Sequence, residues 1–484
     1  MKKVSEGMGV VASRRLDVVV TRIQLMDRPA RMKISLSVGL QNFFSDITWH
    51  SIDSWSEVIS PLGKSRFREL IGAIVAWDAM RFMALGGECL TIADCEILSV
   101  SDSVRDIWRH CFMRQFAEWR YRNHVVYPDP LGPNLLGARF YSNESDFESP
   151  QEYSHNAPEP RCLLTNGGGK DTLASMMILS GLHMDFDLYE GYMPLGGNAE
   201  LQADLLGQLS TPDDGAQRKR CRVTVSDNFF DCPDSQFINN GVICQHYKGD
   251  FMVGHTANYV GYFPLIIAHR YNRILFNIEK SADSPQVHWN GEPINHQWCK
   301  SDEYRRVSTD LFRRLTSLDY FLGFDSPLSG LYDLAIYRII AHRPDLLLRT
   351  HSCNYKKPWC RRCTKCLFCY LMMSALFGED HAMSVVGASA SLFPDSTLRS
   401  TWLELLSDDK IAWECVPGPE ECQLAASLCL RAGIRYPILE QYALADEDVE
   451  RAWRRYGEFD ETVTPGFAKE AIRSMLADIS IGVF

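Results

Sequence analysis

The sequence predicts an α/β protein whose main sheet is largely parallel and is wrapped by helices. In the second half of the chain, short apolar runs typical of buried strands alternate with segments whose apolar residues recur at helical spacing. Such alternation is typical of units in which consecutive strands run parallel. A glycine-rich, polar segment also follows one of these strands directly, and ligands of such sheets bind at the carboxyl ends of strands.

The chain is expected to divide near residue 150. Its 484 residues suffice for two or three domains. The stretch 142–160 is rich in Ser, Asn, Glu and Pro and poor in aliphatic residues, which is typical of a linker. We therefore expect an N-terminal α+β domain over residues 1–150 and a catalytic domain over residues 151–484.

The N-terminal part shows patterns of secondary structure but no motif with evident chemistry. Alternation of apolar and polar residues predicts strands over residues 16–23 and 32–38. Ile71, Ile74 and Val75 lie at helical spacing and predict a helix. We interpret this part as a recognition or packing domain.

Beyond the linker, the alternation begins with a strand over residues 161–165. The following helix would carry Leu173, Met176 and Met177 on one face and end at Gly181. The remaining predicted elements are strands over residues 185–192, 222–226 and 274–278, and a helix that includes Val260, Phe263 and Ile267.

The loop after the strand at 161–165 has the composition of a phosphate site. Three consecutive glycines would let backbone N–H groups approach an anion without interference from Cβ atoms. A helix that starts at Asp171 or Thr172 would direct its positive end to the same point. Lys170 would add a mobile cation, and Asp171 could hold a magnesium ion. The residues expected to bind the nucleotide are Asn166, Gly167, Gly168, Gly169, Lys170, Asp171 and Thr172.

The spacing of this loop separates it from two common phosphate sites. A Walker loop needs a glycine where Thr165 stands, and the dinucleotide-binding motif spreads its glycines apart. The loop resembles instead the Ser-Gly-Gly-x-Asp-Ser loop of the PP-loop ATP pyrophosphatases, with Asn166 or Gly167 in the leading place. Such enzymes typically cleave ATP between the α and β phosphates and adenylate a substrate oxygen. The alternative is a glycine turn in an ordinary α/β fold.

A second group of polar residues follows the strand predicted at 274–278. Lys280 lies at the expected end of that strand, and residues 291–301 are dense in hydrogen-bonding side chains. Within this segment, His296 and Lys300 are four residues apart and would share one face of a helix. The alternative is a solvated loop with one structural histidine.

The segment 353–369 has the spacing of a metal site. Thiolates at two-residue intervals can surround a tetrahedral ion, and a fourth from a nearby loop can complete the set. Cys369 begins an apolar run and is expected to be a buried thiol. A structural zinc is favoured, and an iron–sulfur cluster stays open as an alternative. The expected ligands are Cys353, Cys360, Cys363 and Cys366.

Composition narrows the possible partners and compartment. The formal charge of −11 argues against a general affinity for nucleic acid. No apolar segment is long enough to predict a membrane span. Sixteen cysteines without an evident export signal indicate a reducing cytoplasm, where thiols stay free or bind metal. The sequence does not predict an oligomeric state.

The order of these motifs resembles that of two PP-loop families. The 7-cyano-7-deazaguanine synthases share the glycine loop and the late cysteines, but they are much shorter and lack the Asn-His-Gln cluster. The chain is more similar to the ATP-dependent UDP-N-acetylmuramoyl-L-alanyl-L-glutamate epimerase family (MurL), over about residues 161–422. The shared motifs are Thr165-Asn-Gly-Gly-Gly-Lys-Asp171, Glu279-Lys-Ser281, Asn295-His-Gln297 with Lys300-Ser301, Ser352-Cys-Asn354, Trp359-Cys-x-x-Cys-x-Lys-Cys366 and Glu414-Cys-Val416 with Glu420-Glu421. Two departures are Thr172, where serine is more usual, and Cys299.

This resemblance implies a PP-loop (adenine nucleotide α-hydrolase-like) sheet and a peptide epimerase that uses ATP and Mg²⁺. Its partner would be a UDP-linked muramoyl dipeptide, whose terminal L-Glu is inverted through an acyl adenylate with release of AMP and pyrophosphate. Adenylation removes the carboxylate charge that makes the neighbouring Cα–H a poor acid. The groups that would move the proton are Lys280, His296 and Lys300, with Cys415 as a further candidate.

Two other functions stay open. One is a PP-loop enzyme that adenylates a different carboxylate, such as a deazapurine acid or a natural-product peptide. The other is a nucleotide-binding module without catalysis.

Overall fold

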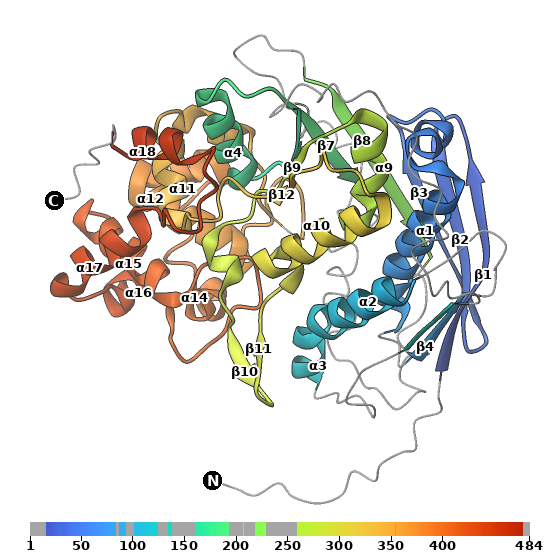
Figure 1. Ribbon diagram of the computed structural model, residues 1–484. Helices are drawn as coiled ribbons and strands as arrows, with labels where there is room; N and C mark the ends of the chain where they lie inside the picture. The colour runs from blue at the N-terminus through green and yellow to red at the C-terminus, as the bar shows by residue number, and fades with distance from the viewer. Residues whose placement is uncertain are drawn as a thin grey trace, which may run out of the picture.

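The computed structural model shows a mixed α/β protein built around one large, mostly parallel sheet (Figure 1). Helices from the N-terminal and central parts of the chain lie along this sheet, and the C-terminal helices gather at one side of the molecule. The structure describes residues 16–83, 87–92, 101–123, 134–137, 161–192, 207, 218–228, 259–353 and 355–477.

The large sheet has the strand order β12-β9-β6-β7-β8-β3-β2-β1-β4-β5. Neighbouring strands run parallel from β12 to β8 and again from β1 to β5. Between these groups, β8, β3, β2 and β1 pair antiparallel. The prediction of a mainly parallel sheet is therefore confirmed. Its strands are β1 (Leu16–Met26), β2 (Ala30–Val38), β3 (Gln41–Trp49), β4 (Gly87–Ile92), β5 (Asn134–Gly137), β6 (Cys162–Thr165), β7 (Phe186–Tyr192), β8 (Arg220–Asp227), β9 (Arg273–Leu275) and β12 (Gly323–Asp325).

One sheet runs through both halves of the chain. Strand β3 of the N-terminal part pairs with β8 of the C-terminal part, in a register from Ser45 opposite Asp227 to Trp49 opposite Val223. The linker predicted at 142–160 lies outside the described residues, so the boundary near residue 150 stays a prediction. A separate hairpin consists of β10 (Val287–Trp289) and β11 (Glu292–Ile294).

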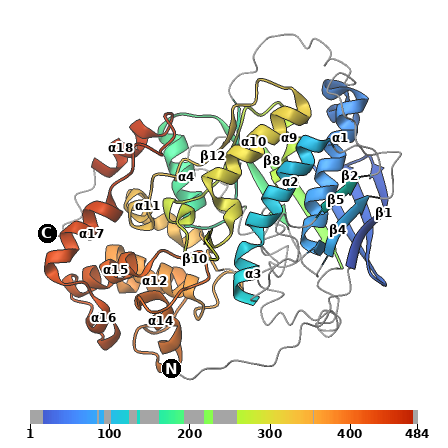
Figure 2. The ribbon, with the colours of Figure 1, turned by 60° about the horizontal axis from the view of Figure 1, so that its bottom comes forward.

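Apolar side chains cover both faces of the parallel strands, because successive residues of a strand point to opposite faces. Leu163 of β6 packs into a cluster with helices from the N-terminal and central parts, whereas its neighbour Leu164 packs against the C-terminal helices. Figure 2 shows α1, α2 and α10 side by side over the sheet. The helices of this layer are α1 (Ser56–Met83), α2 (Asp102–Gln115), α3 (Ala117–Asn123), α9 (Phe263–His269) and α10 (Asp302–Thr316).

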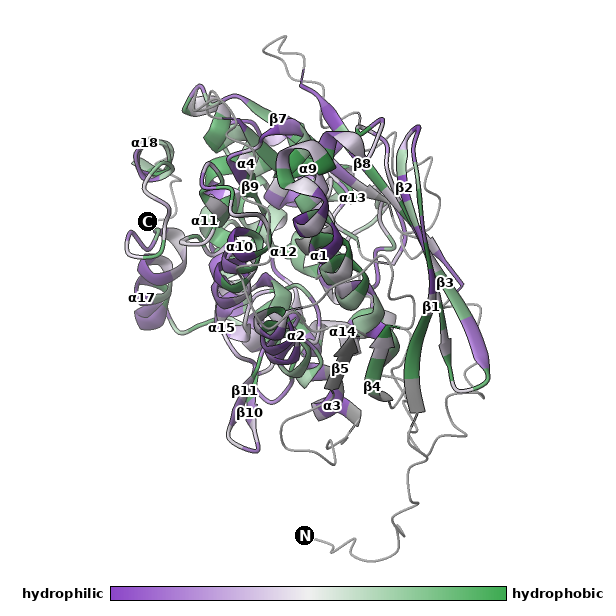
Figure 3. Ribbon diagram, turned by 45° about the vertical axis from the view of Figure 1, so that its right-hand side comes forward, coloured by the Kyte–Doolittle hydropathy of each residue, from purple (hydrophilic) through white to green (hydrophobic). Residues whose placement is uncertain are grey.

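The opposite layer is built around α12, which is buried along most of its length. Helix α17 lies at the surface and presents a polar outer face, coloured purple in Figure 3. Among the described residues, no helix is long and apolar enough to cross a bilayer. The helices of this layer are α4 (Lys170–Gly181), α11 (Asp333–Ile340), α12 (Thr364–Phe377), α13 (Glu379–Val386), α14 (Arg399–Leu406), α15 (Pro419–Arg431), α16 (Pro437–Tyr442), α17 (Asp446–Gly457) and α18 (Lys469–Ala477).

Most of the predicted elements are confirmed, and one strand is shorter than expected. The strand predicted at 274–278 ends at Leu275. The reason is that Ser326 Oγ accepts from the Ile278 N–H (3.1 Å) and donates to the Ile278 carbonyl (2.8 Å), so these backbone groups bind a side chain. The 3₁₀ segments are η4 (Tyr259–Tyr262), η5 (Lys280–Asp283), η6 (Trp298–Lys300), η7 (Pro344–Arg349) and η8 (Ser396–Leu398).

A buried ion pair ties α1 to the sheet and gives a test of the fold. Arg81 Nη1 lies 2.7 Å from Asp227 Oδ2, and both side chains are buried. We expect Arg81→Ala to lower the free energy of unfolding by about 3–5 kcal/mol, because it leaves a buried carboxylate without its cation. The exposed pair Arg306–Asp302 supplies the control, since Arg306→Ala should cost less than about 1 kcal/mol. Equal losses in denaturant titrations of the two variants would contradict this.

Candidate active site

The glycine loop connects the carboxyl end of β6 to the first turn of α4. The predicted residues organise this loop themselves: Asn166 Oδ1 accepts from the Gly168 N–H and Thr172 Oγ1 from the Gly167 N–H, each at 3.1 Å. Gly168 has φ +72°, a backbone conformation that glycine adopts without strain. Helix α4 begins at Lys170, one residue before the earliest predicted start.

Asn277 fastens the loop to the neighbouring strand. Its Nδ2 donates to Thr172 Oγ1 (3.1 Å) and to Thr165 Oγ1 (3.2 Å). Asn277 follows β9, which pairs directly with β6. The two polar segments that follow β6 and β9 in the sequence are thus adjacent, as the parallel arrangement predicted.

A second segment of the chain lies directly on the glycine loop. The His351 N–H donates to the Gly168 carbonyl (2.8 Å), and Ser352 Oγ accepts from the Lys170 N–H (3.3 Å). A Cβ atom on Gly168 would lie 2.0 Å from His351 Cε1, so only glycine fits there. The His351 side chain is fully buried, and neither ring nitrogen has a hydrogen-bond partner within the described structure.

Lys170 differs from the mobile cation expected at this loop. Its side chain is buried, and its ammonium contacts the carboxylates of Asp171 and of Asp333, the first residue of α11. Burial alone would lower the pKa of Lys170, but these two carboxylates outweigh it and raise that pKa. The physical reason is that Lys170 lies in the first turn of α4 with its side chain directed into the core, where its ammonium contacts buried carboxylates. Lys170 therefore supplies a fixed positive charge.

Several buried charges surround this pair. Burial opposes ionisation of Asp171, yet Lys170 and Lys365 hold its pKa below the usual range, so Asp171 is a carboxylate. Glu279 behaves differently, because burial and the nearby Asp171 raise its pKa. Burial also raises the pKa of the neighbouring Glu421. The site therefore contains a carboxylate that stays charged, Asp171, and two carboxyl groups, Glu279 and Glu421, that retain a proton more readily.

A cluster around the Cys415 thiol lies next to these charges. Lys300 Nζ is 2.7 Å from Cys415 Sγ, and His296 Nε2 and Gln297 Oε1 are each 3.6 Å from it. On its other side, the His296 ring places Nδ1 3.1 Å from both carboxylate oxygens of Glu118. These five residues, called the thiol cluster below, come from α3, from the turn before α10 and from the loop before α15.

The charges of the thiol cluster support one another. Burial would raise the pKa of Cys415, but Lys300 and His296 overcome this and lower it to about 6. Burial would lower the pKa of His296, but its hydrogen bonds to Cys415 and Glu118 raise it to about 10. Near neutral pH, the cluster therefore contains a thiolate between two cations.

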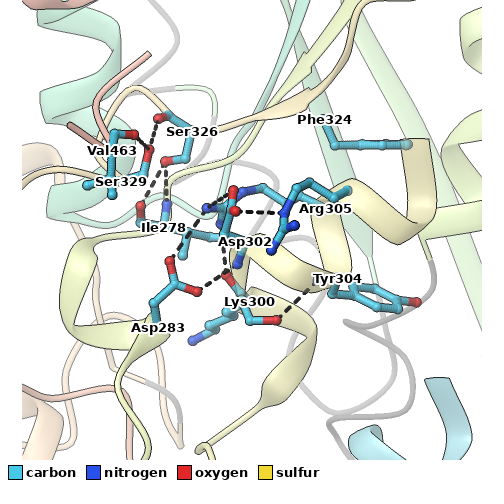
Figure 4. Close-up of polar contacts among 12 residues, drawn as sticks. Ile278, Asp283, Lys300, Asp302, Tyr304, Arg305, Phe324, Ser326, Ser329 and Val463 are labelled. Atoms are coloured by element: carbon cyan, nitrogen blue, oxygen red, sulfur yellow. Dashed lines mark hydrogen bonds and ion pairs between the residues drawn. The ribbon is translucent and has the colours of Figure 1, made fainter. Parts of the chain in front are cut away.

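The turn that carries Lys300 is anchored at the start of α10 (Figure 4). Ser301 Oγ accepts from the Tyr304 N–H (3.2 Å), and Arg305 Nη1 donates to the Lys300 carbonyl (2.8 Å). Gln297 has φ +56°, which interrupts any α-helix between His296 and Lys300. The two side chains thus converge on one sulfur, but across a left-handed turn rather than on one helical face.

Lys365 joins the thiol cluster to the glycine loop. Its ammonium donates to the Cys415 carbonyl, and its charge also lowers the pKa of Asp171. Lys300 acts on the same carboxylate. The thiol cluster and the glycine loop therefore share one electrostatic environment and form one candidate site.

Lys280 has a different partner from the other two proton-transfer candidates. Its Nζ lies 2.6 Å from Asp460 Oδ2 and over the ring of Tyr332, at 5.1 Å from the centroid. Among Lys280, His296 and Lys300, the structure places the last two in the thiol cluster. Lys280 contacts the segment that follows α17.

The four predicted cysteines form a compact cluster that could bind a metal ion. The sulfurs of Cys353, Cys360, Cys363 and Cys366 all lie within 4.8 Å of one another. The Sγ–Sγ distances are 3.9 Å for Cys353–Cys363 and 3.7 Å for Cys360–Cys366. Four thiolates around zinc at about 2.3 Å would be about 3.8 Å apart, so the arrangement fits a tetrahedral ion. Cys369 is fully buried in α12, as predicted.

Some residues of the site had no signal in the sequence. Glu118 lies in the part for which no chemistry was expected, and Asp333 begins a mostly apolar helix outside every motif. Lys365 stood in the shared motif around the cysteines, but no role was assigned to it. His351 directly precedes the Ser-Cys-Asn motif, which could have drawn attention to it.

Comparisons with known proteins give consistent matches. The family model of the MurL N-terminal domain matches residues 265–322, which include His296 and Lys300, and that of the MurL C-terminal domain matches residues 349–448, which include Cys415. No solved structure matches the chain.

Two curated relatives carry the same name, UDP-N-acetyl-alpha-D-muramoyl-L-alanyl-L-glutamate epimerase. One, from a Micromonospora species, is 26% identical over 367 residues, which are 73% of this chain and 74% of the relative. The other, from Salinispora tropica, is 25% identical over 354 residues, which are 71% of this chain and 70% of the relative.

The cysteine cluster predicts a specific loss of metal. We expect the purified protein to contain about one zinc ion per chain and Cys363→Ser to lose most of it, because structural sites need all four ligands. Cys415→Ser is the control, since Cys415 is absent from the four-cysteine set. Elemental analysis of the three proteins provides the measurement. Full zinc content in Cys363→Ser would refute the assignment of the ligands. Iron instead of zinc in the wild-type protein would identify the ion as iron.

The thiol cluster predicts an unusual pH dependence for alkylation. The rate of iodoacetamide reaction at Cys415, followed by peptide mass spectrometry, should rise with pH and level off above a midpoint near pH 6, since only the thiolate reacts. In denaturant, the midpoint for the same residue should return to about 8.5. A native midpoint at or above the denatured one would show that the neighbouring cations do not stabilise the thiolate.

Proposed function

Because the chain belongs to the MurL family, we propose that it is an isomerase that epimerises the terminal glutamate of UDP-N-acetylmuramoyl-L-alanyl-L-glutamate. Both curated relatives are named for this substrate. The observation that carries the proposal is the placement of the thiol cluster beside the glycine loop. An epimerase needs a group that moves a proton at carbon, and a thiolate between two cations is suited to that task.

The reaction would begin with adenylation of the glutamate side of the dipeptide. An oxygen of its terminal carboxylate attacks the α-phosphorus of ATP, the bond from that phosphorus to the bridging oxygen breaks, and pyrophosphate leaves. The new mixed anhydride carries no charge on its carbonyl, so the electron pair released by loss of the Cα proton can move onto the carbonyl oxygen. Return of a proton to the opposite face gives the D-glutamyl centre, and water then releases AMP.

The glycine loop is the proposed site for the triphosphate. Helix α4 directs its N-terminus to the loop, and Lys170 fixes a positive charge beneath it. The buried ring nitrogens of His351 lie against Gly168 without partners, so the imidazole is available to donate to a phosphate oxygen there. We propose that His351 lines the phosphate site on the side of Gly168 and donates a hydrogen bond to a phosphate oxygen.

We propose that a magnesium ion binds at the same place. Asp171 retains its negative charge despite burial, and carboxylate oxygens are the protein ligands that Mg²⁺ prefers. Asp171 would hold the ion, which would neutralise charge on the departing pyrophosphate when bound. The four-cysteine cluster is proposed to hold zinc with a structural role, away from these steps.

The test is a reaction in deuterated water with ATP, Mg²⁺ and the UDP-linked muramoyl dipeptide. We expect AMP, pyrophosphate and a D-glutamyl product with deuterium at the glutamate α-carbon, detected by chiral analysis and mass spectrometry. AMP formation only with another carboxylate, such as a deazapurine acid or a different peptide, would transfer the proposal to that substrate. No nucleotide turnover with any carboxylate would favour a binding module.

Asp171→Asn tests the loop within this reaction. Removal of the carboxylate should lower AMP formation about 10²–10³-fold, the range for loss of one important electrostatic contact to a transition state. Asp446→Asn is a matched control, because Asp446 also lies in the first turn of a helix but is 97% exposed. Wild-type rates for both variants would show that the loop does not act in adenylation.

A further inference from the structure

We propose that Cys415 is a catalytic residue that exchanges one α-proton of the substrate, and that His296 and Lys300 are positioning residues on the same side of the substrate. This inference rests on the proposed epimerase function and assigns its proton-transfer chemistry. The relatives' names specify a substrate and a stereochemical outcome, but no residue.

Convergence on one sulfur atom is the first argument. Lys300, His296 and Gln297 direct polar atoms to Cys415 Sγ, at distances of 2.7, 3.6 and 3.6 Å. The three come from a turn that is distant in sequence from Cys415 and that is anchored on α10. A buried structural thiol needs no such set of charged neighbours, whereas a reactive one does.

Burial separates Cys415 from Glu118, which supports the cluster from behind His296. The Cys415 residue is only partly buried, as are His296 and Lys300, whereas Glu118 is buried. Glu118 binds His296 Nδ1 and also accepts from the Gln297 N–H (3.1 Å), so it fixes both the ring and the backbone next to it. The sulfur thus ends a chain of contacts that begins at the buried Glu118 and passes through His296.

Stereochemistry then divides the roles. Inversion requires that one proton leaves from one face of the α-carbon and another arrives at the opposite face. Since Lys300 and His296 both contact Cys415 Sγ, all three groups meet a substrate from the same side. One of these groups can therefore transfer a proton at one face of the α-carbon. The proton transfer at the opposite face needs a group on the other side of the substrate.

The proton and electron balance of the Cys415 step is complete within the site. The Cα–H bond of the acyl adenylate breaks, an S–H bond forms, and the C–H electron pair moves onto the carbonyl oxygen. In the reverse direction, the same thiol returns its proton to that face. Lys300 and His296 keep the sulfur ionised between turnovers, which is why loss of either cation should act through the thiolate.

The main experiment compares Cys415→Ser and Cys415→Ala with the wild type, using both the L- and the D-glutamyl forms of the UDP-linked dipeptide in deuterated water. We expect both variants to retain ATP–pyrophosphate exchange within about threefold, because adenylation uses the glycine loop. We expect epimerisation to fall by at least about 10³-fold, in line with loss of a general base. The variants should exchange the α-proton of one epimer only, since the group on the opposite face remains.

Three results would overturn the assignment. The first is epimerisation by both variants at a rate within tenfold of the wild-type rate. The second is exchange of the α-protons of both epimers by the variants. The third is loss of pyrophosphate exchange in both variants. A wild type that does not exchange pyrophosphate with either dipeptide would instead refute the proposed function itself. The two failures are therefore distinguishable.

Lys300→Met tests positioning through the pH profile. If the Cys415 pKa rises from about 6 to the free value of about 8.5, the thiolate fraction at pH 7 falls about 30-fold. We expect α-proton exchange to fall by that factor at pH 7 and to recover above about pH 9. Lys410→Met is the control, because Lys410 is exposed on the segment that leads to Cys415. A uniform loss at every pH would show that Lys300 has no effect through the thiolate.

Discussion

The charge balance beneath the glycine loop is the constraint on which the rest of the site depends. A lysine ammonium cannot be buried in a protein interior without compensation, because desolvation costs several kcal/mol per ion. Lys170 is compensated by Asp171 on its own helix and by Asp333 at the start of α11. This pairing joins α4 to α11, and Glu421 reaches the same region by accepting from the Leu334 N–H (2.7 Å). The contact between α4 and α11 and the charged state of Asp171 therefore depend on one buried set of charges.

The candidate site is assembled from segments that are far apart in the sequence. Glu118 comes from the N-terminal part, the glycine loop and Lys300 from the centre, and Lys365 and Cys415 from the C-terminal part. The single sheet explains how these segments meet, since the β3–β8 pairing makes the N-terminal strands continuous with the parallel strands that end at the loop. The N-terminal part thus contributes Glu118 to the candidate site, in addition to packing.

The sequence predicted those features that depend on local patterns. The strand, glycine turn and helix around residues 162–181 follow from composition and periodicity, and the four-cysteine cluster follows from ligand spacing. What could not be predicted depends on tertiary contacts: the burial of Lys170, the ring of His351 against Gly168, and the bond from Glu118 to His296. His296 and Lys300 illustrate both cases. Their proximity was expected from a helix, yet it results from a left-handed turn and from a sulfur that lies more than a hundred residues away.

The short interval between the cysteine cluster and the glycine loop has a physiological consequence. Cys353 is two residues from His351, so the segment that covers Gly168 is held at one end by the loop and at the other by the thiolate set. If the cluster holds an ion, its loss would free one end of that segment, even though the ion lies outside the proposed chemistry. Activity of such an enzyme would then respond to depletion of that metal as well as to the supply of substrate.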